Sequence, residues 1–290
     1  MGFRNVVNDG SSNPPRLRFQ QCTSSMAGES QGSAPEFLNR MAGAGFSGFE
    51  AHCQSEQNAD ELAAMLRERG LAIGYSAVGA EADDLLAPLE LAHRMRADYL
   101  SVRVTGSLKS SPQIAHILKE MYDLVNDAGL PLFIETHGAS VTQDLRRTVK
   151  VVKRFKKVRL TGDVSHYAAV GEFGPAWSED VWDHFQRIAD RSGNWHGRLG
   201  DDAASSETAQ QFKRLWTIGF GAWLKKARPG DVLPFCCESA TGAWEHTLAI
   251  KGLAEEGWAD ALAEQRARDA PAEIDESPAP ADIAADPGMH

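Results

Sequence analysis

The sequence predicts an α/β fold, a single-domain (β/α)8 TIM barrel in which eight parallel strands alternate with helices. Short apolar runs recur at intervals of about 30 residues, and segments with helical spacing of apolar residues separate them. The last four runs end in carboxylate or imidazole side chains, and parallel barrels carry their functional residues at these strand ends. A doubly wound open sheet is the alternative, but it usually has fewer strands, and no GxGxxG follows the first one.

The chain divides into three parts. Residues 1–16 are rich in Gly, Ser, Asn and Pro and are expected to form a flexible lead. Residues 17–268 form the predicted barrel, and residues 269–290 a disordered acidic tail. From Pro271 onward there are five acids and neither Lys nor Arg, so this segment carries half of the net charge of −10. It has too little apolar surface to fold.

The first half of the chain contains four strand-and-helix pairs. Proline in the first turn of the first helix removes an N–H that has no helical partner. Gly70 ends the second helix, a broad leucine stripe marks the third, and Ser111-Pro112 opens the fourth. The expected strands are residues 17–22, 46–52, 71–78 and 97–104, and the first three helices are residues 35–44, 59–69 and 83–96.

The second half repeats the alternation. The segment 140–143 has the pattern of a capping box and precedes Leu145, Val149, Val152 and Phe155 at helical spacing. Ser178 is expected to cap a later helix. The expected strands are residues 130–134, 158–161, 194–199 and 232–238, and two further helices are residues 208–226 and 253–268.

Each of these four later strands ends in an oxygen or nitrogen donor. Taken singly, each donor has a structural interpretation, such as a helix cap for Glu135 or Glu238 and a packed ring for His196. Neighbouring strand ends of a barrel point into one bowl, however, and three carboxylates there repel one another unless a cation is present. Three carboxylates and one imidazole suit a divalent ion such as Mn²⁺, Mg²⁺ or Co²⁺. The four donors are Glu135, Asp163, His196 and Glu238.

These motifs are similar to those of a known group of barrels. ETH at 135–137, GDVSHYAAVGE at 162–172, WHGRLGD at 195–201 and CES at 237–239 resemble the xylose isomerase-like TIM barrels, and within them the sugar phosphate isomerase/epimerase group. That superfamily also includes the ketose 3-epimerases and endonuclease IV. The resemblance covers roughly residues 17–267, and the motifs of the sixth and seventh strands are its most specific parts.

The resemblance implies a metal-dependent active site. Mn²⁺ is the expected ion, with Mg²⁺, Co²⁺ or Zn²⁺ as alternatives. Glu135 and Glu238 would exchange the proton of the substrate, while His166 and Arg198 would face its hydroxyls or carbonyl. The implied ligands of the metal are Glu135, Asp163, His196 and Glu238.

Five further residues lie at or near strand ends and could line the pocket. Of the tryptophans, only Trp195 adjoins a proposed ligand, and we interpret it as a candidate for stacking against a sugar ring, although tryptophans more often pack the barrel wall. The substrate-binding candidates are Glu50, His52, Arg103, His137 and Trp195.

The leading hypothesis is a divalent-metal-dependent isomerase or epimerase that removes a proton next to the carbonyl of a small sugar or keto-polyol. The first alternative is a metal-dependent lyase, such as an inosose or dehydroshikimate dehydratase, or a C-glycoside-cleaving enzyme. An endonuclease IV-like DNA repair enzyme and a non-catalytic sugar-binding barrel are further alternatives.

Composition narrows the set of partners. The acidic body lacks the basic footprint of a nucleic-acid-binding protein, and the cations between Arg146 and Lys157 are interpreted as a solvated helix face. The four cysteines form no CxxC pair, so reduced thiols in the cytoplasm are expected. There is no signal peptide and no membrane span. We expect a small-molecule substrate, no nucleic acid and no membrane; a homo-oligomer remains an open alternative.

Overall fold

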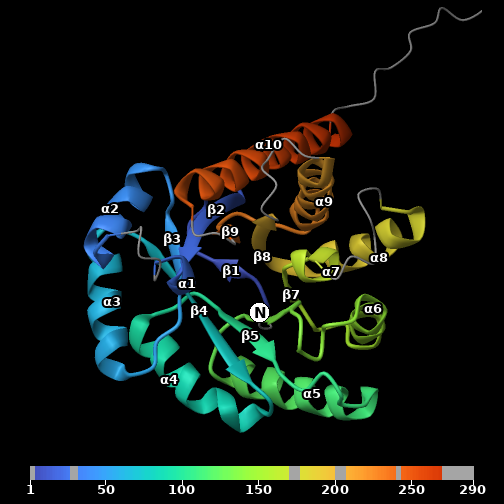
Figure 1. Cartoon of the computed structure of the whole chain (residues 1–290), viewed down its shortest axis with the longest axis horizontal. Helices are drawn as coiled ribbons and strands as arrows, with labels where there is room; N and C mark the ends of the chain where they lie inside the picture. The colour runs from blue at the N-terminus through green and yellow to red at the C-terminus, as the bar shows by residue number, and fades with distance from the viewer. Residues whose placement is uncertain (1–3, 27–31, 170–176, 200–206, 240–242, 270–290) are drawn as a thin grey trace, which may run out of the picture.

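The computed structural model describes residues 4–26, 32–169, 177–199, 207–239 and 243–269 (Figure 1). Within these residues, eight parallel strands, β2 to β9, close into a barrel because β9 pairs with both β8 and β2. Helices surround the strands, as Figure 1 shows. The predicted (β/α)8 barrel is therefore confirmed.

Each parallel strand pairs with its neighbour in the sequence, so the barrel has no crossed connection. A short strand, β1 (Val7–Asn8), pairs antiparallel with the start of β9. The parallel strands are β2 Arg16–Cys22, β3 Gly48–Ala51, β4 Ala72–Gly79, β5 Leu100–Val104, β6 Leu132–Glu135, β7 Leu160–Gly162, β8 Ser192–Leu199 and β9 Asp231–Ser239.

The helices cover the outside of the barrel with apolar faces. Leu62 and Leu66 of α3 and Met121 of α5, for example, are almost fully buried in the core. The helical segments are α1 Thr23–Met26, α2 Ala34–Gly43, α3 Glu56–Glu68, η2 Ala82–Leu85, α4 Leu86–Met95, α5 Ser111–Asp127, α6 Leu145–Arg154, α7 Ser165–Ala169, α8 Glu179–Ala189, α9 Glu207–Leu224 and α10 Trp244–Asp269. No helix in the described part of the chain is long and apolar enough to cross a membrane.

Two helix starts differ in instructive ways. Ser178 caps α8 as predicted, because its hydroxyl accepts the N–H of Val181. The predicted capping box at 140–143 is wrong: α6 begins at Leu145, and the carboxylate of Asp144 accepts the N–H of Arg147 at 2.6 Å. Asp144 stands directly before the apolar periodicity and is itself a preferred cap, so it occupies the position that the serine was expected to take.

Polar side chains fill the middle of the barrel. Because side chains alternate along a strand, every second residue points inward. The hydroxyls of Ser101 and Thr161 lie 2.7 Å apart, and the amide of Asn194 donates to Thr161 at 3.1 Å. Asn194 also donates to Glu50 at 3.1 Å. This buried network lies inside the barrel, directly beneath the side chains at the C-terminal ends of the strands.

The N-terminal segment closes the opposite end of the barrel. Arg4 forms two hydrogen bonds to Asp231 at 3.0 and 2.7 Å. The side-chain amide of Asn5 donates to the carbonyl of Leu132 at 2.7 Å and accepts its N–H at 2.6 Å. Val7 is buried with Tyr99, Phe133 of β6 and Val232 of β9. Residues 1–16 were expected to be a flexible lead. Within residues 4–16, the structure instead shows side chains hydrogen-bonded to the first residues of β6 and β9.

The acidic tail from residue 270 onward lies outside the described residues. We expect a chain that ends at Asp269 to keep the melting temperature and metal affinity of the full chain, because the tail's five acids favour solvation. Thermal unfolding followed by circular dichroism would check this. A drop of many degrees on truncation would show instead that the tail docks on the barrel.

Candidate metal centre

The four predicted donors converge at the C-terminal ends of β6, β7, β8 and β9. Nδ1 of His196 lies 3.5 Å from Oε1 of Glu135 and 3.3 Å from Oε1 of Glu238. Single ligand atoms of Glu135, Asp163 and His196 all lie within 4.8 Å of one another. The structure thus brings together four side chains that are spread over more than a hundred residues of sequence.

One ring nitrogen of His196 is fixed and the other faces the carboxylates. Nε2 lies 2.9 Å from Oε1 of Glu50. The other oxygen of Glu50 accepts from the hydroxyl of Tyr99 at 2.6 Å and from Asn194 at 3.1 Å. Nδ1 of His196 is buried and forms no hydrogen bond with any described residue. A histidine held by a carboxylate on one nitrogen presents the lone pair of the other, which is the arrangement found at metal ligands.

The cluster carries more negative charge than its surroundings neutralise. Burial alone would lower the pKa of His196, but the carboxylates of Glu50 and Glu238 outweigh burial and hold the pKa of His196 well above its ordinary value. Burial raises the pKa of Glu238 well above its usual range, and the charges of Asp163 and Glu135 add to the rise while His196 opposes it. A divalent cation at this point would supply positive charge to the carboxylates and favour their ionised form.

Asp163 joins the cluster to two histidines. The carboxylate of Asp163 is almost fully buried, and Oδ2 lies 3.2 Å from Nε2 of His166 without a hydrogen bond. Burial opposes ionisation of this carboxylate, but His166 and Ser165 hold the pKa of Asp163 below its ordinary value. The rings of His166 and His137 lie 3.9 Å apart between centroids.

His137 in turn meets a cation. Its Nε2 lies 3.3 Å from Nη1 of Arg103 on β5. Burial lowers the pKa of His137, and the neighbouring His166 and Arg103 lower it further. Arg103, His137 and His166 therefore form a line of nitrogen donors beside the carboxylate cluster.

Local hydroxyls position the loop that follows β6. The hydroxyl of Thr142 donates to the carbonyl of Glu135 at 2.7 Å and accepts the N–H of His137 at 3.2 Å. The hydroxyl of Ser140 donates to the carbonyl of His137 at 2.6 Å. These hydrogen bonds hold Glu135 and His137 in place. The segment 140–143, which was expected to cap a helix, therefore positions the end of β6 instead.

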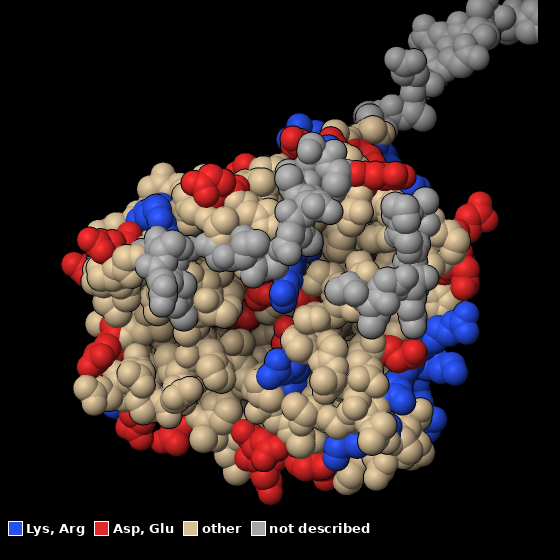
Figure 2. Space-filling view, viewed as in Figure 1, with Lys and Arg blue, Asp and Glu red and all other residues tan. Residues whose placement is uncertain are grey.

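Arg198 lies on the same face of β8 as His196, one pair of residues closer to the strand end. It is half-buried and stands opposite Glu238 in the register of β8 and β9. No carboxylate within the described ranges pairs with its guanidinium. Figure 2 shows a central hollow in which acidic and basic atoms lie side by side. An unpaired guanidinium beside this cluster can bind an oxygen atom of a ligand.

Two substrate-binding candidates are corrected by their positions. The carboxylate of Glu50 is 1% exposed and both its oxygens are bound within the barrel, so Glu50 lies beneath the site and positions His196. Trp195 is 0% exposed and points away from the bowl, because it adjoins the inward-facing His196. Its ring packs on the outer side of the wall, edge-on to Phe220 of α9 at 6.3 Å.

His52 is exposed just after the end of β3, with Nδ1 3.1 Å from the carbonyl of Ser76.

The sequence reasoning missed two cysteines in the bowl. Sγ of Cys22, at the end of β2, lies 3.7 Å from Oε1 of Glu238. Ligand atoms of Cys22, Cys236 and Glu238 lie within 4.8 Å of one another. A hydrogen bond with Cys236 lowers the pKa of Cys22 to about 5 against the effect of burial. Cys22 is the last residue of the first parallel strand, as Glu135 is of the fifth. Its position at a strand end is the signal that could have identified Cys22 from the sequence. Cys237 is buried in the hydrophobic core cluster.

The residues present fit a divalent cation. The buried Nδ1 of His196 and Oδ2 of Asp163 have no hydrogen-bond partner among the described residues, and carboxylate oxygens face them from two further strands. Burying such atoms without a partner is costly, and a shared cation satisfies both. Imidazole and carboxylate donors suit Mn²⁺, Mg²⁺, Co²⁺ or Zn²⁺.

Known proteins resemble this chain in structure but not in sequence. No family model matches this sequence, and no curated protein matches it. The structure resembles the D-psicose 3-epimerase of Clostridium cellulolyticum H10, with a TM-score of 0.51 and 12% identity over 86% of this chain and 98% of that one. It resembles the probable 3-DHS dehydratase AsbF of Bacillus anthracis, with a TM-score of 0.53 and 14% identity over 82% and 97%.

A third similar structure is the AP endonuclease, family 2, of Brucella melitensis, with a TM-score of 0.55 and 15% identity over 77% of this chain and 92% of that one. Identities this low show a shared fold and leave the reaction open. All three proteins are covered almost from end to end, so the likeness extends over the whole barrel. The chain therefore shares the TIM-barrel fold of these proteins.

Proposed function

We propose that this protein is a divalent-metal-dependent isomerase or epimerase of a small sugar or keto-polyol. The observation that carries the proposal is the state of His196. Its Nε2 is held by Glu50, and its buried Nδ1 faces carboxylate oxygens of Glu135 and Glu238 at 3.5 and 3.3 Å. An arrangement of this kind costs stability unless a cation completes it, which favours a functional site over a structural one.

The residues that would hold the ion are Glu135, Asp163, His196 and Glu238. When bound, a divalent ion supplies Lewis-acid chemistry, which polarises a substrate carbonyl and acidifies the neighbouring C–H. Mn²⁺ is the ion we propose, since three carboxylates and one imidazole form a mostly hard set of donors.

Glu135 and Glu238 would move the substrate proton. They approach His196 from the strands on opposite sides of β7 and β8, so a substrate above the cluster would have one carboxylate on each side. One carboxylate can then remove a proton from carbon while the other returns one to the opposite face, which inverts the centre. Return of the proton to the neighbouring carbon would give an isomer instead.

Arg198 and His166 would bind the oxygen on which negative charge develops. Arg198 is half-buried without a paired carboxylate in the described ranges, and it adjoins Glu238 across the strands. His166 lies 3.2 Å from Asp163 and is 20% exposed in its side chain, so it reaches the bowl. Donors that are already in place when charge develops stabilise the transition state more than the ground state.

A dehydratase is the second candidate, and one observation favours it. The rings of His137 and His166 lie 3.9 Å apart at an interplanar angle of 49°, with Arg103 3.3 Å from His137, and so place N–H groups beside the carboxylates. Elimination of water needs such a donor for the departing hydroxyl after the same first proton removal. The structure of the dehydratase from Bacillus anthracis shares this fold, which is compatible with either reaction.

The test is uptake of deuterium from D₂O into candidate ketoses and cyclic keto-polyols by the Mn²⁺-loaded protein. Exchange next to the carbonyl with recovery of an epimer or isomer is the expected result. Exchange followed by loss of water would instead assign the dehydratase. Turnover of a substrate without any C–H cleavage would overturn both, because each begins with removal of that proton.

Arg198→Ala should slow this exchange by on the order of a hundredfold or more while the metal stays bound. Loss of the guanidinium removes a donor to the developing oxyanion and none of the metal ligands. Arg154→Ala is the matched control, because Arg154 is exposed at the end of α6 and should leave the rate unchanged. Equal rates for Arg198→Ala and the native protein would remove Arg198 from the mechanism.

A further inference from the structure

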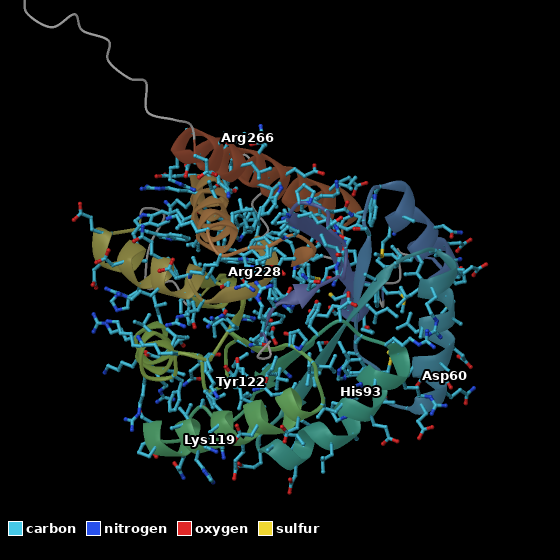
Figure 3. All side chains as sticks on the ribbon, turned by 180° about the vertical axis from the view of Figure 1, so that it is seen from behind. Asp60, His93, Lys119, Tyr122, Arg228 and Arg266 are labelled. Carbon is cyan, nitrogen blue, oxygen red and sulfur yellow. The ribbon has the colours of Figure 1, made fainter. Side chains whose placement is uncertain are left out.

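A second cavity lies at the other end of the barrel, where the strands begin. Its volume is about 710 Å³, within the range of small-molecule sites. Residues before β7, at the starts of β8 and β9, and at the ends of α5, α6, α8 and α9 line it. Figure 3 views the molecule from behind, and Tyr122 and Arg228 of this basal cavity lie near the middle of that view.

The wall of the basal cavity is strongly basic although the protein carries a net charge of −10. Six cations line it, with two carboxylates, Asp190 and Asp231. The cations come from segments far apart in the sequence, so no local charge run reveals them together. They are Arg4, Lys156, Lys157, Arg159, Lys226 and Arg228.

Among the described residues, a carboxylate pairs with only one of these cations. Arg4 binds both oxygens of Asp231, which also accept from Asn8 at 2.8 Å and from the backbone N–H of Arg228 at 2.8 Å. Asp231 therefore has no capacity for a further cation. The other five side chains form no ion pair with any carboxylate in the part of the chain that the structure describes.

The helix ends account for part of this charge. Four helices end at this face, and each C-terminus carries about half a negative charge, which attracts lysine and arginine. The four helix ends together contribute roughly two negative charges, and the exposed carboxylate of Asp190 adds one more. The five cations without a carboxylate partner among the described residues outnumber these negative charges. Positive charge remains in excess after the helix dipoles are counted, so the cavity is suited to an anion.

The deepest cation shows the same imbalance. Arg159 is half-buried, and within the described residues its guanidinium donates to the backbone carbonyls of Lys156 at 3.0 Å and Val158 at 3.1 Å. Burial and the nearby charge of Arg191 lower the pKa of Arg159, which no carboxylate offsets. Beside it, Oδ1 of Asn126 is buried and has no hydrogen-bond partner among the described residues. An anion could accept from the guanidinium of Arg159, and an O–H or N–H of a ligand's organic part could donate to Oδ1 of Asn126.

We propose that the basal cavity binds a phosphorylated small organic molecule. Its phosphate groups would contact Arg159, Arg228 and the lysines, since clustered guanidinium and ammonium groups recognise phosphate oxygens through charge-assisted hydrogen bonds. Its organic part would lie against Trp223 and Ala227, which add apolar surface to the same wall. This site is separate from the carboxylate cluster and does not depend on the reaction carried out there.

The test is isothermal titration of the full chain with ADP, a nucleoside diphosphate, in the presence of EDTA so that no metal ion bridges the probe to the carboxylate cluster. Saturable binding is expected, with adenosine, which lacks phosphate, at least tenfold weaker. Lys226→Gln/Arg228→Gln should weaken ADP binding at least tenfold. Lys153→Gln/Arg154→Gln, which removes the same charge from exposed positions outside the cavity, should change it less than twofold.

Three outcomes would overturn the proposal. The first is no saturable binding of ADP at millimolar concentration, and the second is equal weakening by the two double variants. The third is binding that appears only in the chain ending at Asp269, because the acidic tail would then be the occupant of the cavity in the full protein. Circular dichroism of each variant confirms that a loss of binding is not a loss of fold.

Discussion

His196→Ala/Glu238→Ala is expected to lose nearly all Mn²⁺ that the native protein retains. The two side chains contribute the only imidazole of the proposed ligand set and one of its three carboxylates, and Glu238 lies 3.3 Å from Nδ1 of His196. Half of the ligands would be absent, and the remaining pair cannot enclose an ion. Elemental analysis after exposure to Mn²⁺ and gel filtration should give about one equivalent for the native protein and close to none for the variant.

The chain offers a matched control in α5. His116 and Glu120 form a similar pair at 3.2 Å but are exposed at the surface. His116→Ala/Glu120→Ala should therefore retain the native metal content. Glu50→Gln tests whether the carboxylate that binds Nε2 of His196 strengthens metal binding. Loss of a carboxylate behind a ligating histidine typically weakens metal affinity 10- to 100-fold, and we expect a loss of that size. Unchanged occupancy in His196→Ala/Glu238→Ala would rule out the assigned ligands.

Trp195→Ala is expected to destabilise the barrel strongly and to leave the metal centre able to bind. The ring is 0% exposed and packs between strand and helix, so its removal leaves a large cavity. Replacement of a buried tryptophan by alanine typically costs about 3–5 kcal/mol. Urea unfolding followed by circular dichroism would measure the loss. A change below about 1 kcal/mol would contradict the packing position and revive the expectation that this ring contacts substrate.

Two glycines of α9 test the same contact from the other side. A Cβ at Gly219 would lie 2.3 Å from Cζ2 of Trp195, whereas a Cβ at Gly221 would meet nothing within 4 Å. Gly219→Ala should therefore cost about 1–3 kcal/mol through overpacking. Gly221→Ala should be neutral or stabilising by up to about 1 kcal/mol, because alanine is the better helix former. Equal effects of the two substitutions would place the ring elsewhere.

The strand-and-helix alternation of this chain could be predicted because it is local. A periodicity of two or of 3.6 residues is set by neighbours in the sequence, and so is the change from apolar to polar residues where a strand ends. The same rule brought Glu135, Asp163, His196 and Glu238 to one edge of the barrel. Closure of the barrel then made that edge a ring, as the pairing of β9 with β2 shows.

The roles of individual side chains were harder to predict for two reasons. Trp195 was assigned to the pocket because it adjoins His196, yet strand alternation directs adjacent side chains to opposite faces. That information was present in the sequence. Glu50 is different, because its burial depends on Tyr99, Asn194 and His196, which are 49 to 146 residues away. No local pattern distinguishes a carboxylate under the site from one at its rim.

The basal cavity could not be predicted from the sequence for a similar reason. Lys156 and Lys157 read as the solvated end of a helix, and Arg4 read as part of a flexible lead. They belong to one wall only because the strand starts of β7, β8 and β9 lie side by side. A charge surplus that is assembled from separate segments is a property of the closed barrel.

The contacts of Glu50 also constrain how the chain assembles. β3 comes from the first quarter of the chain and β8 from the third, and Glu50 gains His196 and Asn194 as partners only after these strands have met inside one closed wall. In a partial barrel, the same carboxylate would have to remain hydrated and would keep water in the interior, since burying it unpaired is costly. The final strands therefore add their packing and the partners of this charge in the same step. Such coupling between distant parts of the chain favours all-or-none folding over a stable half-barrel, and it makes completion of the site and completion of the fold a single event.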